Sequence, residues 1–430
     1  MHPDERTVAV IGSGVSGLVA AYVLAQRNRV TLYEADSRLG GHAHTHQIAL
    51  GQDDGRTTGV DSAFLVHNDR TYPTLCRLFD ELGIATRDTD MSMSVRDDAS
   101  GLEYAGARGI GGLFPSLSSL TRPRYLYMLA EVKRFHRAAQ RLLESDADEA
   151  TVGEFLDRHG FSQFFVDHFM TPLIAAVWSA PPGQSLNYPA RYLFVFLEHH
   201  GMLSVFNSPT WRTVVGGSAT YVDAVAQVID EVRIGAAVRS VRRRPDGVEV
   251  SDGISTPRSY DAVVIATHPD QALQMLAEPT SAQRSILGAI EYSTNHAQLH
   301  TDESVLPRHR RARASWNYLA TSGDAPVMVT YDVSRLMRLD DAPRILVTLG
   351  GQDRVDPASV LTEMTYSHPM YTPTSVAAQQ LLPTLNDDRM VFAGAYHGWG
   401  FHEDGAVSGV RAAQHLGVDW PATAREAVTC

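Results

Sequence analysis

Four short and almost wholly apolar runs stand out along the chain, at residues 7–11, 29–34, 261–266 and 389–394. Apolar runs of this length are typical of strands in a parallel sheet that helices cover on both faces. A helical stretch from Leu18 to Gln26 separates the first two runs, which predicts a strand–helix–strand unit. Because the other two runs come much later, we expect one sheet assembled from distant parts of the chain.

Two long segments with other patterns interrupt these runs. Between Tyr125 and Leu142 apolar residues recur at three- and four-residue spacing, as one helix face requires, at Leu129, Val132, Phe135 and Ala139. An aromatic-rich region continues to about Leu203, and residues 291–375 alternate like strands around 297–300 and 327–331. The pattern predicts an α/β protein whose sheet is interrupted by a helical insertion and by a second, strand-containing one.

Composition narrows the class of protein. The 430 residues are 44% hydrophobic and carry 37 basic and 49 acidic side chains, a formal charge of −12 that disfavours nucleic acid as a partner. Cys76 and Cys430 are too few for a disulfide framework. The charged N-terminus predicts no signal peptide, and no apolar run approaches the roughly 20 residues of a membrane span. We expect a soluble, cytoplasmic protein without a metal centre; its oligomeric state stays open.

Lysine is almost absent. Lys133 is the only one, so 36 of the 37 basic residues are arginines. It lies in the predicted helix beside Glu131 and Arg134, where we expect it to be solvated. Any chemistry that needs a lysine therefore has one poorly placed candidate.

A glycine-rich turn lies between the first strand and its helix. Gly12, Gly14 and Gly17 form the pattern G-x-G-x-x-G, in which the glycines permit a tight turn, the approach of a pyrophosphate and close helix–strand packing. Free N–H groups at the helix start, around Ser16, favour the phosphate charge. Glu34 ends the second strand, where a carboxylate accepts hydrogen bonds from a ribose diol and repels a 2′-phosphate. The turn predicts a dinucleotide site that disfavours NADP.

The residues that follow Glu34 distinguish NAD from FAD. The run Glu34-Ala35-Asp36-Ser37-Arg38-Leu39-Gly40-Gly41 resembles the extended motif of flavoproteins in the amine oxidase superfamily. In that superfamily the arginine and the glycines surround the pyrophosphate and ribitol of FAD. The resemblance therefore implies FAD, with Ala35, Arg38, Gly40 and Gly41 among its contacts and the neighbouring His42 close by.

Further segments resemble the same superfamily at the expected places. Residues 211–218, which begin with Trp211, resemble the turn beneath the flavin, and Val238 stands at the centre of a predicted strand, 234–241, whose backbone pairs with adenine. Ala266 and Gly394 end two of the apolar runs. Residues 404–413 resemble the final flavin-binding helix, with Asp404, Gly405, Ala406 and Ser408 at its start. The N–H groups of that helix would stabilise the charge that builds on the reduced flavin.

The resemblance implies a domain organisation. A discontinuous, Rossmann-like FAD-binding domain would comprise residues 1–75, 205–290 and 386–430. An inserted α+β substrate domain would comprise residues 76–204 and 291–385.

A narrower resemblance concerns the substrate. Residues 60–68, 70–73, 314–318 and 400–405 are similar to those of a bacterial group of predicted NAD/FAD-binding, amine-oxidase-like proteins. Genes of this group often lie beside cyclopropane-fatty-acid synthase-like methyltransferases, and some relatives are implicated in oxidising methylated fatty acyl chains. This context implies an apolar, fatty-acyl or lipid-like small molecule as substrate.

The missing lysine bears on the mechanism. Amine and polyamine oxidases of the superfamily commonly hold a lysine, through a water, at flavin N5. The corresponding strand here, about 295–301, offers Asn295, His296, Gln298 and His300 instead. The cysteine of covalent flavin attachment is also missing near the last helix. We expect non-covalent FAD and no lysine–water arrangement, with a histidyl link through His42 as the alternative.

Candidate catalytic residues come from segments expected to face the flavin. They are His67, Tyr396, His397, His402 and Glu403. A histidine near its usual pKa, or a carboxyl whose pKa burial raises, suits proton transfer at neutral pH. Each candidate also has a structural interpretation. Tyr396 and Trp399 would then only pack on the flavin, and His402 would only cap the helix. Asp61 is expected to hold a helix or loop in place rather than to act as a base.

A basic run at residues 308–313 stands out in an acidic chain. One interpretation is a solvated loop. The other is a patch, extended by Arg122, Arg124, Lys133, Arg134 and Arg137, that meets anionic phospholipid headgroups or an acyl carrier. The second would make the protein peripheral to the membrane, with an apolar tunnel to receive the chain of a lipid.

These observations predict an FAD-dependent oxidoreductase that removes a hydride from a C–H bond and so desaturates an apolar substrate. Three alternatives remain open. They are an FAD-dependent isomerase without net redox change, a true amine oxidase, and a non-catalytic flavoprotein partner of a lipid methyltransferase.

Overall fold

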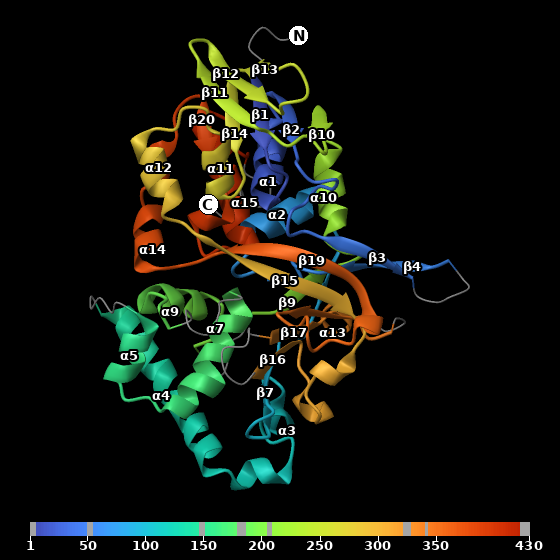
Figure 1. Ribbon diagram of the computed structural model, residues 1–430, viewed down its shortest axis with the longest axis vertical. Coiled ribbons are helices and arrows are strands. Elements are labelled where there is room, and N and C mark those ends of the chain that lie inside the picture. The colour runs from blue at the N-terminus through green and yellow to red at the C-terminus, as the bar shows by residue number, and fades with distance from the viewer. Residues whose placement is uncertain are drawn as a thin grey trace.

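The computed structural model describes residues 6–49, 55–145, 151–178, 186–203, 209–320, 328–339 and 343–421. The first five residues, Val327 and Cys430, on which some expectations rested, lie outside these ranges. Figure 1 shows two parts, with a parallel sheet and its helices at the top and a mixed sheet with further helices, including the longest described one, below.

The parallel sheet combines strands from distant parts of the chain, as the apolar runs predicted. Its order is β10 (Glu231–Arg233), β2 (Arg29–Tyr33), β1 (Thr7–Ile11), β14 (Ala262–Ile265) and β20 (Met390–Phe392), and every neighbouring pair is parallel. In β1, Val8 and Val10 face one core, whereas Ala9 and Ile11 face another. Both faces of the sheet are therefore covered, which explains why its strands are apolar without alternation.

Different elements cover the two faces. The helices α1 (Val15–Leu24) and α15 (His402–His415) pack on one side so closely that a Cβ on Gly409 would lie 2.4 Å from the Ser16 carbonyl oxygen. The other side carries α11 (Pro269–Met275), α12 (Ser281–Gly288) and the antiparallel strands β11 (Ser240–Arg244), β12 (Gly247–Ser251) and β13 (Arg258–Tyr260). The predicted strand 234–241 is wrong, because a turn at Ile234–Gly235 and an irregular extended segment precede β11.

The second part contains a seven-stranded mixed sheet. Its order is β19 (Val360–Pro369), β15 (Tyr292–His300), β18 (Leu346–Leu349), β17 (Met328–Asp332), β16 (Trp316–Ala320), β7 (Met93–Asp97) and β8 (Leu102–Gly106). Only β16 and β7 run parallel. Both strand-like regions of the second insertion are therefore confirmed within the described residues.

Helices surround one end of this sheet. They are α4 (Pro123–Glu144), α5 (Val152–Arg158), α6 (Gln163–Phe165), η2 (Val166–Met170), α7 (Thr171–Trp178) and α9 (Ala190–His199). The predicted helix 125–142 is confirmed as α4; Leu129 and Val132 are only half-buried, and Met128 takes a core position instead. In the described ranges, no helix is both long and apolar enough to cross a bilayer.

The remaining elements are mostly short and lie in or between the two parts. They are β3 (Thr45–Ala49), β4 (Thr57–Asp61), β5 (His67–Asn68), α2 (Pro73–Leu82), β6 (Thr86–Asp88), α3 (Gly109–Leu113), η1 (Leu117–Thr121), β9 (Trp211–Val214), α10 (Ala219–Ala226), η3 (Glu303–Val305), η4 (Arg310–Ala312), α13 (Val333–Met337), η5 (Pro357–Ser359), α14 (Pro373–Gln379), η6 (Leu382–Leu385) and η7 (Ala395–His397). Asp61, expected to anchor structure, ends β4 and accepts hydrogen bonds from Ser218 N–H and the hydroxyls of Ser218 and Thr45.

Candidate functional site

A cavity of about 880 Å³ is lined by residues of both parts of the molecule. One half, the dinucleotide end, is lined by the glycine-rich turn, residues 33–36, residues 236–239 and residues 266–268. The other half, the apolar end, is lined mainly by large hydrophobic side chains. They are Phe64, Leu65, Val66, Tyr72, Met91, Ala176, Val177, Trp178, Phe196, Met202, Trp211, Trp316, Tyr331 and Leu349.

The glycine-rich turn is shaped for an anionic group. Gly12 has φ +99°, and a Cβ there would lie 2.7 Å from the Ala266 carbonyl oxygen, so another side chain would strain the turn. Around Gly14 no heavy atom lies within 4 Å of such a Cβ, and α1 begins there without a side-chain cap. Backbone N–H groups at the start of the helix therefore face open space, as a pyrophosphate requires. Gly17 serves packing, because its Cβ would overlap the Gly12 carbonyl oxygen.

Glu34 is fixed on the wall of the cavity. One carboxylate oxygen accepts hydrogen bonds from the backbone N–H and hydroxyl of Ser13, and the other accepts one from Asp36 N–H at 2.8 Å. The neighbouring Ala35 also lines the cavity. The remaining lone pairs of a preoriented carboxylate can accept hydrogen bonds from a ribose.

Arg38 and the two glycines after it shape the loop rather than line the cavity together. The Arg38 guanidinium donates to the carbonyl oxygens of Gly41 at 2.7 Å and Ala43 at 3.3 Å. Gly40 donates its N–H to Ser13, while Gly41 lines the cavity beside Gly14. Arg38 therefore holds the loop in place in this structure.

The other residues expected to contact the flavin cofactor or to act in catalysis divide into those that line the cavity and those that do not. Val238, Ala266, Gly394, Tyr396, His402, Ser16, His42 and Trp211 line the cavity. His67, His397, Glu403, Asp404, Gly405, Ala406 and Ser408 are not among its lining residues. Ser408 instead accepts the Gly394 N–H at 2.9 Å, and a Cβ on Gly405 would lie 2.5 Å from Val15.

Both acidic residues at the start of α15 make structural contacts. Glu403 accepts the backbone N–H groups of Thr74 at 2.8 Å and Leu75 at 3.0 Å, at the start of α2. Asp404 accepts the Phe401 N–H at 2.9 Å, and burial raises its pKa to about 7. The position of Glu403 favours an anchor between helices over a catalytic base.

His402 is the best placed of the candidate histidines. Its ring stacks on Phe64 at 3.8 Å, it lines the cavity, and its Nε2 is buried without a hydrogen-bond partner among the described residues. Burial lowers its pKa to about 3, so the ring is neutral at physiological pH. His67 and His397 lie behind the wall, and burial lowers the pKa of each to about 4.

Charged side chains are confined to one end of the cavity. Among the described residues that line it, these are Glu34, Asp36 and Arg239, all at the dinucleotide end. The only lysine, Lys133, is exposed on α4, and none of Asn295, His296, Gln298 and His300 lines the cavity. Cys76 lies in α2, also away from the lining. The apolar end therefore offers no counter-ion for a cationic substrate.

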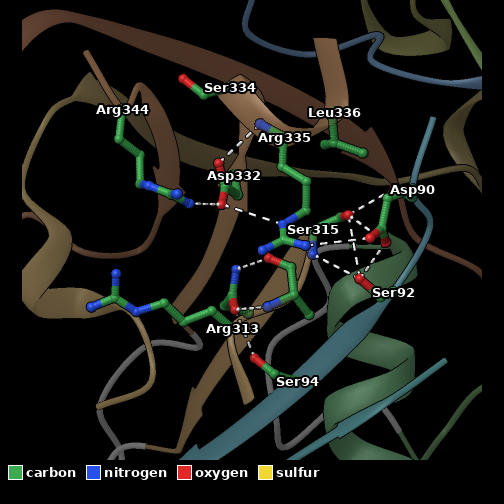
Figure 2. Close-up of polar contacts among 12 residues, drawn as sticks. Asp90, Ser92, Ser94, Arg313, Ser315, Asp332, Ser334, Arg335, Leu336 and Arg344 are labelled. Carbon is green, nitrogen blue, oxygen red and sulfur yellow. Dashed lines mark hydrogen bonds and ion pairs between the residues drawn. The ribbon is translucent and has the colours of Figure 1, made fainter. Parts of the chain in front are cut away.

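A polar network behind the apolar end holds three of its walls (Figure 2). Asp90 accepts hydrogen bonds from Ser92 at 2.6 Å and Ser315 at 3.1 Å and pairs with Arg335 at 3.3 Å. Fully buried Asp332 pairs with Arg335 and Arg344. Asp90, Ser315 and Asp332 directly precede or follow cavity residues, which are Met91, Trp316 and Tyr331. The network therefore fixes these three walls from the side remote from the cavity.

A hydrogen-bonded chain leads from the cavity towards the surface, and the sequence pattern did not reveal it. Ser62 and Tyr366 line the cavity, and their hydroxyl oxygens are 2.6 Å apart. His46 Nε2 lies 2.8 Å from Ser62 Oγ, and His44 Nδ1 lies 2.9 Å from the Tyr366 hydroxyl. Both histidines are half-buried, His46 on β3 and His44 just before it. Ser367, His368 and Pro369, which follow Tyr366 on β19, also line the cavity, so the end of this strand forms one of its walls.

The chain matches a known family over most of its length. Residues 15–417 match the family of flavin containing amine oxidoreductases. The chain therefore belongs to that family, which accounts for the dinucleotide end of the cavity and implies a flavin cofactor.

Two curated relatives match parts of the chain. "Protoporphyrinogen oxidase 2, chloroplastic/mitochondrial" of Arabidopsis thaliana is 29% identical over 187 residues, 41% of this chain and 33% of the relative. "Carotenoid phi-ring synthase" of Streptomyces griseus is 27% identical over 317 residues, 69% of this chain and 58% of the relative. The matches thus span one third to somewhat over half of these relatives' own length.

Solved structures share the whole fold at low identity. Cyclohexylamine oxidase from Brevibacterium oxydans has a TM-score of 0.68 at 16% identity, covering 96% of this chain and 98% of that one. A fatty acid isomerase from P. acnes has a TM-score of 0.65 at 15% identity, covering 95% and 98%. These likenesses establish the flavin amine oxidase fold, with its Rossmann-like sheet.

Proposed function

We propose that this protein is an FAD-dependent oxidoreductase that removes a hydride from a C–H bond of an apolar, fatty-acyl-like molecule. The observation that carries the proposal is the confinement of charged residues to the dinucleotide end of the cavity. An apolar chain loses no hydrogen bond on entering the apolar end, whereas an ammonium group would lose its hydration without gaining a counter-ion. A true amine oxidase is the weaker candidate for this reason.

The described residues fit the cofactor. The open space at Gly14, the carboxylate of Glu34 and the segment around Val238 would hold the dinucleotide. FAD supplies a hydride acceptor when it is bound. No cysteine among the described residues lines the cavity, which supports non-covalent binding.

His402 is the proton acceptor in this proposal. Its unpartnered Nε2 lies at the cavity wall and its ring is neutral at physiological pH, so it can accept a proton there; because burial lowers its pKa to about 3, it is a weak base that would pass the proton on at once. The chain through Ser62 and Tyr366 to His44 and His46 would pass a proton to solvent. Such a path would connect the cavity wall to two partly exposed histidines, which suits a dehydrogenation that releases a proton.

The resemblance to a bacterial group encoded beside lipid methyltransferases, and the carotenoid-related name of one curated relative, also favour an apolar substrate. The test is mass spectrometry of the small molecules released from the purified flavoprotein. The proposal expects a fatty acid or another long apolar molecule. Recovery of an amine, with flavin reduction by that amine, would contradict it.

A further inference from the structure

One end of the molecule exposes large hydrophobic side chains in a short stretch of chain. Ile110 is 79% exposed, Leu117 84%, Leu120 51% and Tyr127 56%, and Leu126 is also exposed. The other exposed large hydrophobic residues of the described chain are scattered singly over six further positions. Exposed apolar side chains that gather in one region mark interaction surfaces, whereas scattered ones are ordinary, and these five lie within 18 residues of the chain.

The same stretch lacks negative charge. Between Glu103 and Glu131 the sequence contains no acidic residue, in a protein with 49 of them. Arg124 lies within it, and η4 brings Arg311 beside α3, since a Cβ on Gly111 would lie 3.9 Å from the Arg311 side chain. Arg124, Arg310 and Arg311 make no ion pair or side-chain hydrogen bond with any other residue that the structure describes.

Other basic residues of this region are already paired. Arg308 pairs with Asp98 at 3.0 Å and Arg313 with Glu303, while Arg134 pairs with buried Glu131 and lies over the Phe161 ring. The basic run therefore does not act as one patch. Exposed Lys133 and Arg137, farther along α4, have no ion pair among the described residues, but they lie beyond the stretch of exposed apolar side chains.

We propose that this surface, formed by Ile110, Leu117, Leu120 and Tyr127 with Arg124, Arg310 and Arg311, docks on a bilayer of anionic phospholipid. The apolar side chains would enter the boundary between headgroups and acyl chains, and the arginines would meet the phosphates. In Figure 1 the surface lies around α3 and the start of α4, at the lower end of the molecule and far from β1 and β2. Docking there leaves the dinucleotide part in water.

A protein with a net negative charge can bind an anionic membrane only through a surface that is locally basic. The overall charge of −12 is repelled by the membrane, but at physiological salt the charges that lie more than the Debye length of about 8 Å from the membrane surface are screened. The arginines of the docking surface then determine the electrostatic interaction with the membrane, and each raises the membrane affinity about fivefold. The inference concerns the surface alone, so it stands whether or not the cavity oxidises a lipid.

The test is co-sedimentation of the full-length flavoprotein with two kinds of vesicle, phosphatidylcholine alone and phosphatidylcholine with phosphatidylglycerol. We expect binding to the second kind, weakened by salt. The double variant Arg310→Ala/Arg311→Ala should lower the affinity about 30-fold, and Leu117→Ser/Leu120→Ser at least about tenfold. These side chains are exposed, so the variants should keep the flavin content and thermal midpoint of the parent protein.

Matched controls use similar residues elsewhere. Arg27 and Arg284 are exposed and make no ion pair or side-chain hydrogen bond with other described residues, and Ile254 is 90% exposed in a distant loop. Arg27→Ala/Arg284→Ala and Ile254→Ser should leave vesicle binding unchanged. Equal losses in the control variants would overturn the proposal, as would the absence of binding to either vesicle. Dimers that the surface variants convert to monomers, without vesicle binding, would assign the surface to a second copy of the chain instead.

Discussion

The dinucleotide end of the cavity is made mostly from backbone that is close in sequence, whereas the apolar end is assembled from side chains of several distant segments. At the first, Gly12, Gly14 and Glu34 lie within one strand–helix–strand unit. At the second, Phe64, Trp178 and Trp316 come from three separate parts of the chain. Binding a common cofactor needs only a conserved local geometry, while the substrate wall can change with each distant segment independently.

The two ends are also stabilised differently. The glycine-rich turn depends on the absence of side chains, and the apolar end depends on a buried polar network behind Met91, Trp316 and Tyr331. We therefore expect substitutions at the two ends to separate flavin binding from folding stability.

The largest effect on folding stability is expected at the network behind the apolar end. Asp332→Ala should lower the free energy of unfolding by roughly 1 to 3 kcal/mol, because it removes the acceptor of the Arg335 backbone N–H and one partner of two partly exposed guanidinium groups, which keep Asp90 and Glu303. Denaturant unfolding measures this loss. A change below about 1 kcal/mol, the size expected of a surface ion pair, would show that the network does not support the cavity.

At the dinucleotide end we expect a substitution to weaken flavin binding without lowering the folding stability. Gly14 has φ −61°, which any residue adopts, and open space around its Cβ position. Gly14→Val should therefore leave the fold of the flavin-free protein unchanged and weaken flavin binding about 1,000-fold, through the loss of charge-assisted hydrogen bonds to phosphate. Flavin titration followed by fluorescence measures the affinity. Gly106→Val, at the end of β8, is the control and should bind flavin normally.

His402 joins the two ends, since α15 begins at the cavity wall. His402→Phe keeps an aromatic ring on Phe64 and removes the proton acceptor. The turnover number should fall about 100-fold with little change in flavin content. Turnover at the parental rate would remove His402 from the proposed chemistry, and His67→Phe, behind the wall, serves as the comparison.

Acid should destabilise both ends. Burial lowers the pKa of His368 and His397 to about 4 and of His402 to about 3, below the ordinary 6.5. At a pH between the lowered pKa and 6.5, the folded state binds fewer protons than the unfolded state. The stabilisation that each neutral histidine gives the folded state is therefore fully present above about pH 6.5 and is lost as the pH falls. Each histidine contributes about 1.4 kcal/mol per pH unit in this window.

Buried carboxyl groups oppose this trend. Burial raises the pKa of Asp404 to about 7 and of Asp61 to about 6, and it also raises those of Asp332 and Glu403, so the stability that each contributes is present at low pH and decreases as the pH rises. Eleven described histidines have a lowered pKa against these four carboxyls, so the histidines dominate in mildly acidic solution. Denaturant midpoints measured from neutral to mildly acidic pH should therefore decrease, and a midpoint that rises towards pH 5 would contradict the burial of these rings.

The local part of this design could be predicted from the sequence. The glycine-rich turn, Glu34 and helix α4 follow from patterns within a few tens of residues, and the structure confirms them. Glu403 could not be interpreted correctly from the sequence, because its partners Thr74 and Leu75 lie over 300 residues away. Ser62, which follows β4, and Tyr366 of β19 are likewise about 300 residues apart in the chain. The predicted strand at 234–241 failed for residues 234–239, which contain a turn and make only isolated backbone hydrogen bonds, with Asp36, Glu34 and Ser251, that a sequence pattern does not distinguish from a strand.

The measurement that tests the central claim most directly is anaerobic mixing of the purified flavoprotein with long-chain fatty acids, followed by the visible absorbance of the flavin. The account predicts lasting bleaching by an apolar chain and no bleaching by simple amines. Bleaching by amines alone would contradict it. If a fatty acid is converted to an isomer and the flavin is oxidised when the reaction ends, the protein is an isomerase rather than a dehydrogenase.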